Sequence, residues 1–563
     1  MSRDFDVIVV GSGISGGWAA KEFTERGYST LVLERGEPLS SPHYPTEGVP
    51  PWKIPNAGRV PLDEVEQDYP VQGRCYAFSE YTKHHFINDR ENPYEWEEGR
   101  PFDWIRGSKV GGRSLLWHRQ SYRWSDYDFS ANKRDKHGVD WPIRYRDVAP
   151  WYDHVERFAG ISGNRDGLSQ LPDGVFQKPH EMLDVEKHIK RELEKAYPGR
   201  NLIIGRCAHL TEPTPEQLEL GRGLCQSRNE CQRGCSWGGY FSSQSATLPA
   251  AERTGLMTLR ANAVVDSVAY DSASGRVSGV RWVDATSGEK HFSSARLIFL
   301  CASTLASTQI LLNSRTDRFP NGLGNDSGVL GHYLMDHVAG AGASGDIAGF
   351  EGFYYKGRRP TPVYIPRFAG ITEPQAGYVR GFGYQGGAYR QGWAERPGNE
   401  IGRALKDKLR SPGKWRFSMV GFGEMLPQKN NRVSLNNKKL DRFDIPLLRI
   451  DCTFGDNEAK IKKAIAEEGA SMLKAAGLGN VTSYQSESYP GIAIHEMGTA
   501  RMGRDPATSF LNGFNQSHAV ANLFVTDGSA FASSACQNPS LTYMALTARA
   551  VAYADKQVQA GVI

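Results

Sequence analysis

The chain has 563 residues, a formal net charge of +4, 39% hydrophobic and 23% charged residues, and 61 glycines. A chain of this length exceeds the roughly 100–200 residues of one domain, so we expect at least two lobes around a large core. The composition excludes a disordered or fibrous protein. The charge is spread without a basic run, so nucleic acid is not an expected partner.

Signals for export or membrane insertion are not evident in the sequence. The first residues, MSRDF, lead directly into an apolar strand without the three regions of a secretory signal. We therefore expect a cytoplasmic protein, or a periplasmic one only if a signal-bearing partner exports it. The most apolar stretch, 297–312, contains Ser, Thr and Gln and is shorter than the roughly 18 residues of a membrane span, so no span is predicted.

An apolar strand and a glycine-rich turn open the chain. Residues 5–10 read FDVIVV, which is typical of a strand buried on both faces of a parallel sheet. Gly11, Gly13 and Gly16 follow as G-x-G-x-x-G. In this pattern the first glycine makes the turn, the second lets backbone approach a pyrophosphate, and the third lets a helix pack on the strand. The helix predicted from about Ser15 directs its N–H groups at the phosphates.

A second strand, predicted over 29–33, ends at Glu34. An acid about 20 residues beyond the first glycine accepts hydrogen bonds from a ribose in dinucleotide-binding folds. These features together predict a dinucleotide site rather than an empty strand–helix turn, and Glu34 disfavours NADP because it would repel a 2′-phosphate. Gly111 and Gly112, within RGSKVGGRSLLW, predict either a second close backbone approach to a ligand or a β-turn.

Four segments carry a resemblance to a known family. They are GSGISGG with Glu34, VGGRSLLW, DWPIRYRDVAPWYDHVE at 140–156, and the stretch from Ile494 to Ala550. In this order, over nearly the whole chain, they resemble the glucose-methanol-choline (GMC) oxidoreductases, and most closely the bacterial sugar and glycoside 3-dehydrogenases and pyranose oxidase-like enzymes. The resemblance implies an α/β fold with an FAD-binding Rossmann-like lobe and a substrate lobe built on an antiparallel sheet.

Each of the two lobes expected for this fold is built from several separate segments of the chain. The FAD-binding lobe is predicted to comprise 1–38, 100–160, 200–335 and 490–563, the substrate lobe 161–199 and 336–489, and a loop insertion 39–99.

The resemblance also assigns residues to the cofactor. It implies that Gly111 and Gly112 approach the isoalloxazine and that Val264 or Val265 contacts the adenine end. Asp527 and Gly528 are similarly implied to contact the flavin phosphate and ribityl chain. Pyranose oxidase-like proteins carry a flavin-linked histidine at the position of Leu116, whereas His118 stands two residues further on. FAD is therefore expected to be non-covalent, with His118 a pocket or structural residue.

The catalytic residues are predicted near the C-terminus. A strand ending at Ile494 would deliver His495, and Asn538-Pro539 would open a helix. Oxidation of an alcohol by a flavin needs a base, which an imidazole with a pKa of about 6.5 can supply, and a second polar group that holds the same oxygen. His495 as base and Asn538 as orienting partner match the family positions. The alternatives are a core histidine satisfied by backbone and a helix N-cap.

Three cysteines cluster in LCQSRNECQRGCSWGG, at Cys225, Cys231 and Cys235. Three thiolates can ligate a 3Fe-4S cluster, as in related membrane-linked dehydrogenases, although this loop departs from their spacing and has Trp237 where a proline is expected. A loop without metal, or a zinc site completed by Cys207 or His209, remain alternatives.

The region 340–425 is rich in aromatic residues whose alternation favours strands. Such rings usually form a sheet core, and a sugar pocket would use some of them. The resemblance also suggests that Glu424 lies near the substrate.

The predicted function is FAD-dependent oxidation of a secondary ring hydroxyl of a sugar or glycoside, with C3 favoured over C2 or C1. The expected electron acceptor is a quinone, a cytochrome or a partner subunit. An oxidase that uses O₂ is the nearest alternative. A non-catalytic flavin- or nucleotide-binding subunit and an NAD-dependent dehydrogenase are alternatives of other classes.

Overall fold

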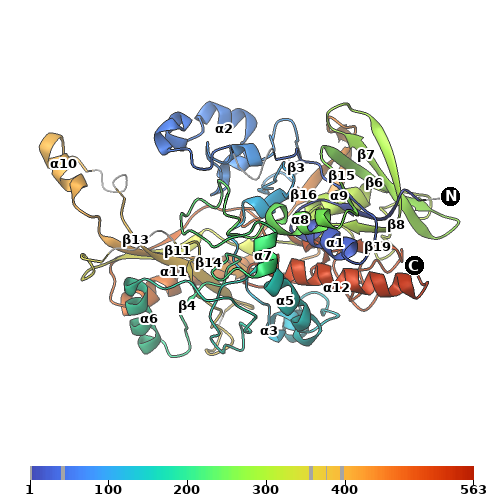
Figure 1. The fold of residues 1–563 in the computed structure, drawn as a ribbon. Helices are drawn as coiled ribbons and strands as arrows, with labels where there is room; N and C mark the ends of the chain where they lie inside the picture. Colours follow the sequence, from blue (N-terminus) through green and yellow to red (C-terminus); the bar gives the residue numbers. More distant parts are fainter. Residues whose placement is uncertain (1–2, 40–44, 354–358, 376, 393–397) are drawn as a thin grey trace.

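The computed structural model describes residues 3–39, 45–353, 359–375, 377–392 and 398–563. Three sheets organise the chain. The first lies near both termini, at the right of Figure 1, and the second forms the opposite end of the molecule. Among the described residues, no helix is long and apolar enough to cross a membrane.

The first sheet combines a parallel part with an antiparallel meander. Its order is β5 (Met257–Arg260), β2 (Thr30–Leu33), β1 (Phe5–Val10), β8 (Lys290–Leu300), β7 (Arg276–Asp284) and β6 (Ala263–Asp271), with β19 (Leu523–Val525) also paired to β8. Strands β5, β2, β1 and β19 run parallel to their neighbours, whereas β7 is antiparallel to both β6 and β8. The strands expected at 5–10 and 29–33 are confirmed.

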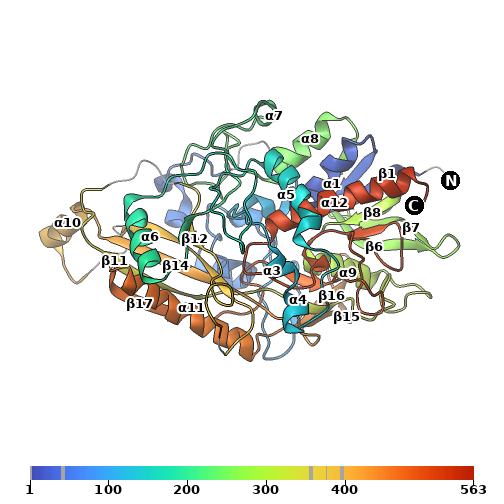
Figure 2. The same ribbon diagram turned by 90° about the horizontal axis from the view of Figure 1, so that it is seen from below.

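Helices cover this first sheet and extend from it. The helix α12 (Ser540–Gln559) packs against α1 (Ile14–Thr24) and α5 (Tyr145–Ala159), and the three lie together in Figure 2.

The other α-helices of the described residues are distributed over the rest of the chain. They are α2 (Leu62–Asp68), α3 (Asp126–Phe129), α4 (Ala131–Asp135), α6 (Asp184–Ala196), α7 (Pro215–Glu219), α8 (Leu248–Arg253), α9 (Thr304–Asn313), α10 (Gly402–Arg410) and α11 (Asp456–Ala475).

The second sheet is antiparallel. Its order is β17 (Gly479–Gln485), β11 (Ala341–Ile347), β14 (Trp415–Glu424), β13 (Phe382–Arg390), β12 (Val363–Ile365) and β4 (Ile203–Ile204), with β10 (His337–Val338) paired to β14. One face packs on α11, where Tyr384 donates a hydrogen bond to the Ile465 carbonyl. Because side chains alternate along a strand, Gln385, Val420 and Phe422 point to the opposite face.

Aromatic side chains of 340–425 form the core of this second sheet, as the alternation predicts. Tyr364, Phe368, Phe382 and Tyr384 are each at most 2% exposed. Tyr354, Tyr355 and Trp393 lie outside the described residues.

A third sheet connects the other two. Its order is β18 (Met497–Thr499), β9 (His332–Met335), β15 (Arg432–Leu440), β16 (Pro446–Asp451) and β3 (Glu95–Trp96). The strand expected to end at Ile494 is not formed. The preceding residues make turns, and the first strand here, β18, starts after His495. The backbone N–H groups of this turn are bound by a carboxylate instead of a neighbouring strand, as described below.

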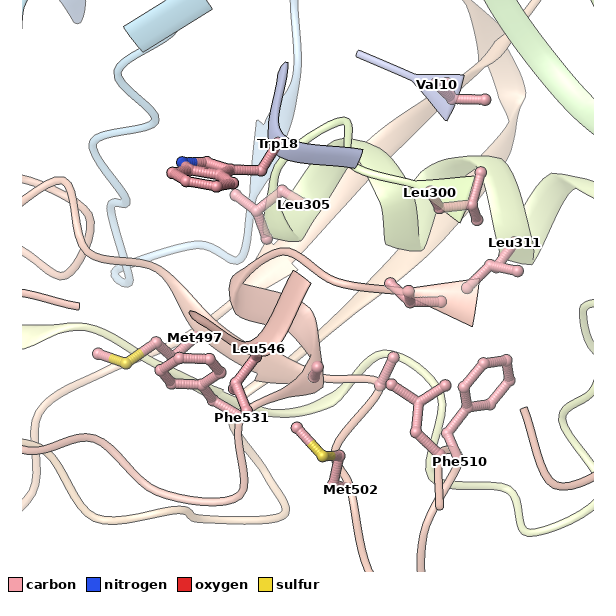
Figure 3. Close-up of a cluster of buried hydrophobic side chains, with 14 of the residues drawn as sticks. Val10, Trp18, Leu300, Leu305, Leu311, Met497, Met502, Phe510, Phe531 and Leu546 are labelled. Carbon is pink, nitrogen blue, oxygen red and sulfur yellow. The ribbon is translucent and has the colours of Figure 1, made fainter. Parts of the chain in front are cut away.

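A continuous hydrophobic core joins the first sheet to the C-terminal segment. Figure 3 shows Val10 of β1, Leu300 of β8 and Leu311 of α9, which belong to the same buried cluster as Met497 of β18 and Leu546 of α12. All five side chains are at most 3% exposed. Full burial of such a side chain contributes about 1.5–3 kcal/mol, so this core holds the segments on either side of His495 and Asn538 against the parallel strands.

The turn between β1 and α1 has the geometry that its three glycines predict. Gly11 has φ +97°, and a Cβ there would lie 2.6 Å from the Cys301 carbonyl oxygen. A Cβ on Gly16 would lie 1.8 Å from the Gly11 carbonyl oxygen, so only glycine allows α1 to approach the strand this closely. A Cβ on Gly13 meets no protein atom within 4 Å. The second glycine therefore faces open space.

Alanine at the second and third glycines should separate cofactor binding from folding. Gly16→Ala forces an overlap with backbone and is expected to lower the stability of the flavin-free protein by about 1–3 kcal/mol or more. Gly13→Ala should leave that stability within about 0.5 kcal/mol but reduce flavin content, because the added methyl occupies the ligand's space. Denaturant unfolding of the apoprotein and flavin absorbance of the purified protein measure the two effects. Equal destabilisation by both substitutions would contradict this division of roles.

Candidate active site

One large cavity lies between the first sheet and the open face of the second. Its volume is about 1140 Å³, and its lining extends from Gly11 and Glu34 to His495 and Asn538. Sites for small ligands and cofactors usually measure about 300–1,000 Å³, so this cavity is large enough for a dinucleotide together with a substrate.

Most of the residues expected at a cofactor line this cavity. They are Gly11, Gly13, Glu34, Gly112, Val264, Asp527 and Gly528. Gly16 and Gly111 are not part of the lining. Gly16 serves helix packing, and the Gly111 N–H donates to the Ser12 hydroxyl, which ties the two glycine turns together.

The Glu34 carboxylate is fixed at the end of β2. It accepts hydrogen bonds from the N–H and hydroxyl of Ser12, at 2.9 and 2.6 Å, and from the N–H of Gly36 at 2.8 Å. Its side chain borders the same cavity as Gly13, whose α-carbon side is open. An acid at the strand end beside an open glycine turn fits the ribose and pyrophosphate of a dinucleotide.

The other end of the cavity is bordered by the start of α12. Ser540 and Tyr543, in its first turns, line the cavity with Asp527 and Gly528. A helix N-terminus presents unpaired N–H groups and a partial positive charge, which stabilise negative charge nearby. This end therefore fits the electron-rich ring of a reduced flavin.

The loop that carries His495 is held by the buried carboxylate of Asp336. Its Oδ2 accepts from the N–H groups of Gly491 and Ala493, at 2.7 and 3.2 Å, and its Oδ1 accepts from the N–H of His495 at 3.0 Å. Burial raises the pKa of Asp336 to about 7, against the opposing effect of these N–H donors. One side chain thus replaces the strand partner that this segment lacks.

The imidazole of His495 lies between a second histidine and Asn538. Its Nδ1 is 3.0 Å from the Nδ1 of His337, and its Nε2 is 3.3 Å from the Nδ2 of Asn538. Phe422 packs near both rings, at 6.1 Å from His495 and 6.4 Å from His337 between ring centroids. The alternative of a core histidine satisfied by backbone does not describe this ring, because both nitrogens contact side chains.

These contacts determine where the proton on His495 resides. Two nitrogens at 3.0 Å share one proton, and the Asn538 amide nitrogen is itself a donor toward Nε2. The consistent arrangement places the proton on Nδ1 of His495 and leaves Nε2 as an unprotonated acceptor, which faces the Asn538 amide. Burial, together with His337 and Arg113, lowers the pKa of His495 well below its usual value of 6.5. The ring is therefore neutral at pH 7.

Asn538 is held in place by a residue of the second sheet. Its Oδ1 accepts a 2.6 Å hydrogen bond from Nε2 of Gln385 on β13. The N-cap of α12 is Pro539, and no side chain makes a capping hydrogen bond there. Asn538 therefore does not act as the N-cap that was its alternative interpretation, and its amide faces His495.

Glu424 lies away from the cavity, contrary to expectation. It is fully buried at the end of β14 and forms ion pairs with Arg367 and, at 3.5 Å, with Arg380. A buried carboxylate between two guanidinium groups is neutralised by them, because an unpaired charge in the interior is very unfavourable. This network supports the segment before Asn538 without lining the cavity.

The three clustered cysteines border a second, much smaller cavity of about 20 Å³. His209 lies there too, with its Nε2 3.4 Å from the Cys231 sulfur, whereas Cys207 contacts Ser162 instead. Within the described residues, no group of three or more His, Cys, Asp or Glu side chains is placed to hold a metal ion. The structure therefore does not show the iron–sulfur or zinc site expected at Cys225, Cys231 and Cys235, and the chemistry proposed for the active site does not use it.

The region 39–99, which was expected to be a loop insertion, also lines the cavity. The 39–99 region, which contains α2 as well as loops, contributes Tyr76, whose ring meets His118 edge-to-face at 4.9 Å between centroids. Leu116, Trp117 and His118 line the same cavity. The aromatic residues of this cavity wall include Tyr76, Trp117 and Phe422, and Phe422 is the one that comes from the aromatic-rich region 340–425 among the described residues.

Four residues of this site were not singled out from the sequence: Asp336, His337, Gln385 and Tyr76. The pair Asp336-His337 had a usable signal, since two titratable residues interrupt the apolar run LMDHVA. Gln385 and Tyr76 had none, because their roles depend on contacts between distant segments.

Curated relatives cover almost the whole chain. The chain is 28% identical to 2-methyl-1,2-propanediol dehydrogenase of Mycolicibacterium austroafricanum, with 98% of this chain and 95% of that protein covered. It is 24% identical to the fructose dehydrogenase large subunit of Gluconobacter japonicus, with 97% and 96% covered. Paromamine 6′-oxidase of Streptomyces fradiae is 25% identical, with 96% and 90% covered.

Solved structures share the fold at lower identity. Pyridoxine 4-oxidase from Mesorbium loti superposes with a TM-score of 0.59 at 15% identity, covering 98% of this chain and 99% of that one. A formate oxidase from Aspergillus oryzae RIB40 gives a TM-score of 0.62 at 14% identity, covering 99% and 100%.

Two family models, both described as GMC oxidoreductase, match residues 5–339 and 427–547. GMC oxidoreductases bind FAD, and the cavity described above has the glycine turns, the acid and the helix N-terminus that this cofactor requires. The chain belongs to the GMC oxidoreductase family, as an enzyme that acts on CH–OH donors.

Proposed function

We propose that this enzyme oxidises a secondary ring hydroxyl of a sugar or glycoside to a keto-sugar, with C3 favoured over C2 or C1. The observation that carries the proposal is the pair formed by His495 Nε2 and Asn538 Nδ2, 3.3 Å apart at the wall of the cofactor cavity. An acceptor and a donor at this separation can hold one hydroxyl group from two sides.

The two side chains divide the work on that hydroxyl. Asn538 donates a hydrogen bond to its oxygen, and His495 takes its proton on Nε2 as the C–H hydrogen leaves with its electron pair. FAD, when bound, supplies the ring atom that accepts this hydride. The His337 contact keeps the His495 proton on Nδ1, so that Nε2 is available as the base.

The relatives support a polyhydroxylated substrate and a separate electron acceptor. Fructose and paromamine, named in two of them, are sugar-type compounds, and one relative is described as the large subunit of its enzyme. Because the fructose dehydrogenase chain is a subunit of a larger enzyme, we favour a quinone, a cytochrome or a partner subunit as electron acceptor, and O₂ is the second candidate because paromamine 6′-oxidase is named as an oxidase. Because Leu116 occupies the position of the linkable histidine, we also propose that FAD is bound non-covalently.

Anaerobic bleaching of the flavin by sugars tests the function directly. Addition of a panel of sugars and glycosides to the oxidised enzyme under argon is expected to bleach the visible flavin band, and mass spectrometry should then find a keto-sugar. Reoxidation by a quinone analogue is expected to outpace reoxidation by air. A flavin band that stays unchanged with every sugar, glycoside and simple alcohol would reject oxidation of CH–OH groups at this site.

Removal of the proposed base should slow the chemical step while leaving the cofactor bound. His495→Ala is expected to lower the anaerobic rate of flavin reduction by a factor on the order of 10²–10⁴, with flavin content unchanged. The control is His137→Ala, an exposed histidine outside the cavity, which should reduce flavin at the wild-type rate. Near-wild-type reduction by the His495→Ala variant would refute the assignment.

The pH dependence of flavin reduction should reflect the lowered pKa of His495. A base with a lowered pKa keeps its unprotonated form as the pH falls, so the limiting rate is expected to stay constant from about pH 8 to below the ordinary histidine pKa of about 6.5. The decline should appear only under more acidic conditions. Stopped-flow reduction at saturating substrate measures this, and a half-loss of the rate at pH 6.5 or above would contradict a lowered pKa of the base.

A further inference from the structure

We propose that Gln385 recognises a hydroxyl on the carbon next to the reacting one, so that the active site takes vicinal diols. The inference rests on the proposed function, because it presupposes that a hydroxyl is held between His495 and Asn538. It adds the chemical feature by which the substrate is selected.

The second sheet brings Gln385 to the cavity and surrounds it with apolar groups. The residues of β13 and β14 that line the cavity are Gln385, Gly386, Val420 and Phe422. Val420 is the direct cross-strand partner of Gln385. Gln385 is thus the polar side chain that these two strands present to a ligand.

The amide of Gln385 has unused hydrogen-bonding capacity. One N–H of its Nε2 is committed to Asn538 Oδ1 at 2.6 Å. In the described part of the chain, this amide makes no other hydrogen bond, which leaves the Oε1 acceptor and one N–H. The Oε1 lone pairs can accept from a hydroxyl, whereas a ligand that encloses this amide without a polar partner leaves the acceptor unsatisfied and binds less tightly.

Contact between the two amides restricts the ligand geometry. Because Gln385 and Asn538 are directly hydrogen-bonded, a molecule whose reacting oxygen meets Asn538 Nδ2 brings its neighbouring atoms beside Gln385. A hydroxyl on the adjacent carbon can then donate to Gln385 Oε1. Sugars meet this requirement, and so does the 1,2-diol named in one relative, whereas a simple alcohol does not.

The same hydrogen bond makes Gln385 a positioning residue for Asn538. By donating to Oδ1 it directs the Asn538 NH₂ group toward His495 Nε2. Gln385 therefore links recognition of the second hydroxyl to the orientation of the group that holds the first.

The test compares cyclohexanol with cis- and trans-1,2-cyclohexanediol, which differ only in the adjacent hydroxyl. We expect the wild-type enzyme to reduce its flavin with at least one diol about 10-fold more efficiently than with cyclohexanol, by rate over dissociation constant. Gln385→Met keeps the side-chain length but cannot accept this bond, so the preference should fall to within about 3-fold. The measured quantity is a ratio between substrates. If Gln385→Met also displaces Asn538 and slows flavin reduction with every substrate, this ratio does not change.

Two comparisons make the outcome decisive. Gln391→Met makes the same change just beyond the end of β13, outside the cavity, and should keep the wild-type diol preference, whereas Gln385→Glu should lose the donor to Asn538 and lower the rate for all three compounds alike. A Gln385→Met enzyme with the full diol preference would overturn the inference while leaving the proposed function intact. If no compound reduces the flavin, calorimetric binding of diol against cyclohexanol to wild type and Gln385→Met decides the inference separately, and equal ratios overturn it.

Discussion

The carboxylate of Asp336 is the constraint on which the active site depends. The residues before His495 form no strand, so their backbone N–H groups would be buried without partners if this side chain were absent. Three N–H donors on one carboxylate fix the turn and, through the N–H of His495 itself, the position of this imidazole. The next residue along the chain, His337, touches the same imidazole at Nδ1. Adjacent residues of one segment thus set both the place and the protonation of His495.

The cofactor side depends on close backbone approach. Gly11 and Gly16 remove two Cβ atoms that would collide with backbone, and Gly13 faces the open cavity. Ser12 then connects the turn to Glu34 and to Gly111, so that both glycine turns and the acid at the end of β2 form one hydrogen-bonded unit. Such a preformed site orders few groups when the dinucleotide binds, which favours tight binding.

The sequence predicts the elements that rest on local pattern. The strands at 5–10 and 29–33, the glycine turn between strand and helix, and the helix after Pro539 all follow from short-range periodicity and turn chemistry, and each is found. The predicted strand before His495 is wrong because a distant carboxylate satisfies its backbone. The expectation that Glu424 lies near the substrate is wrong for a similar reason, because its two arginine partners come from separate segments of the chain. Gln385 and Tyr76 reach the cavity through long-range pairing that no local signal records.

Side chains alternate between the two faces of the second sheet, so that one face packs on α11 and the other lines the cavity. Tyr384 and the glycines of β14 pack on α11, where a Cβ on Gly421 or Gly423 would approach an isoleucine side chain within 2.4 Å. Gln385, Val420 and Phe422, on the other face, contact only what enters the cavity and the residues beside it. Substitutions on the cavity face can therefore change the preferred alcohol without disturbing the packing that holds the lobe together. A family with this sheet can diversify its substrates at very few positions while its redox centre stays the same.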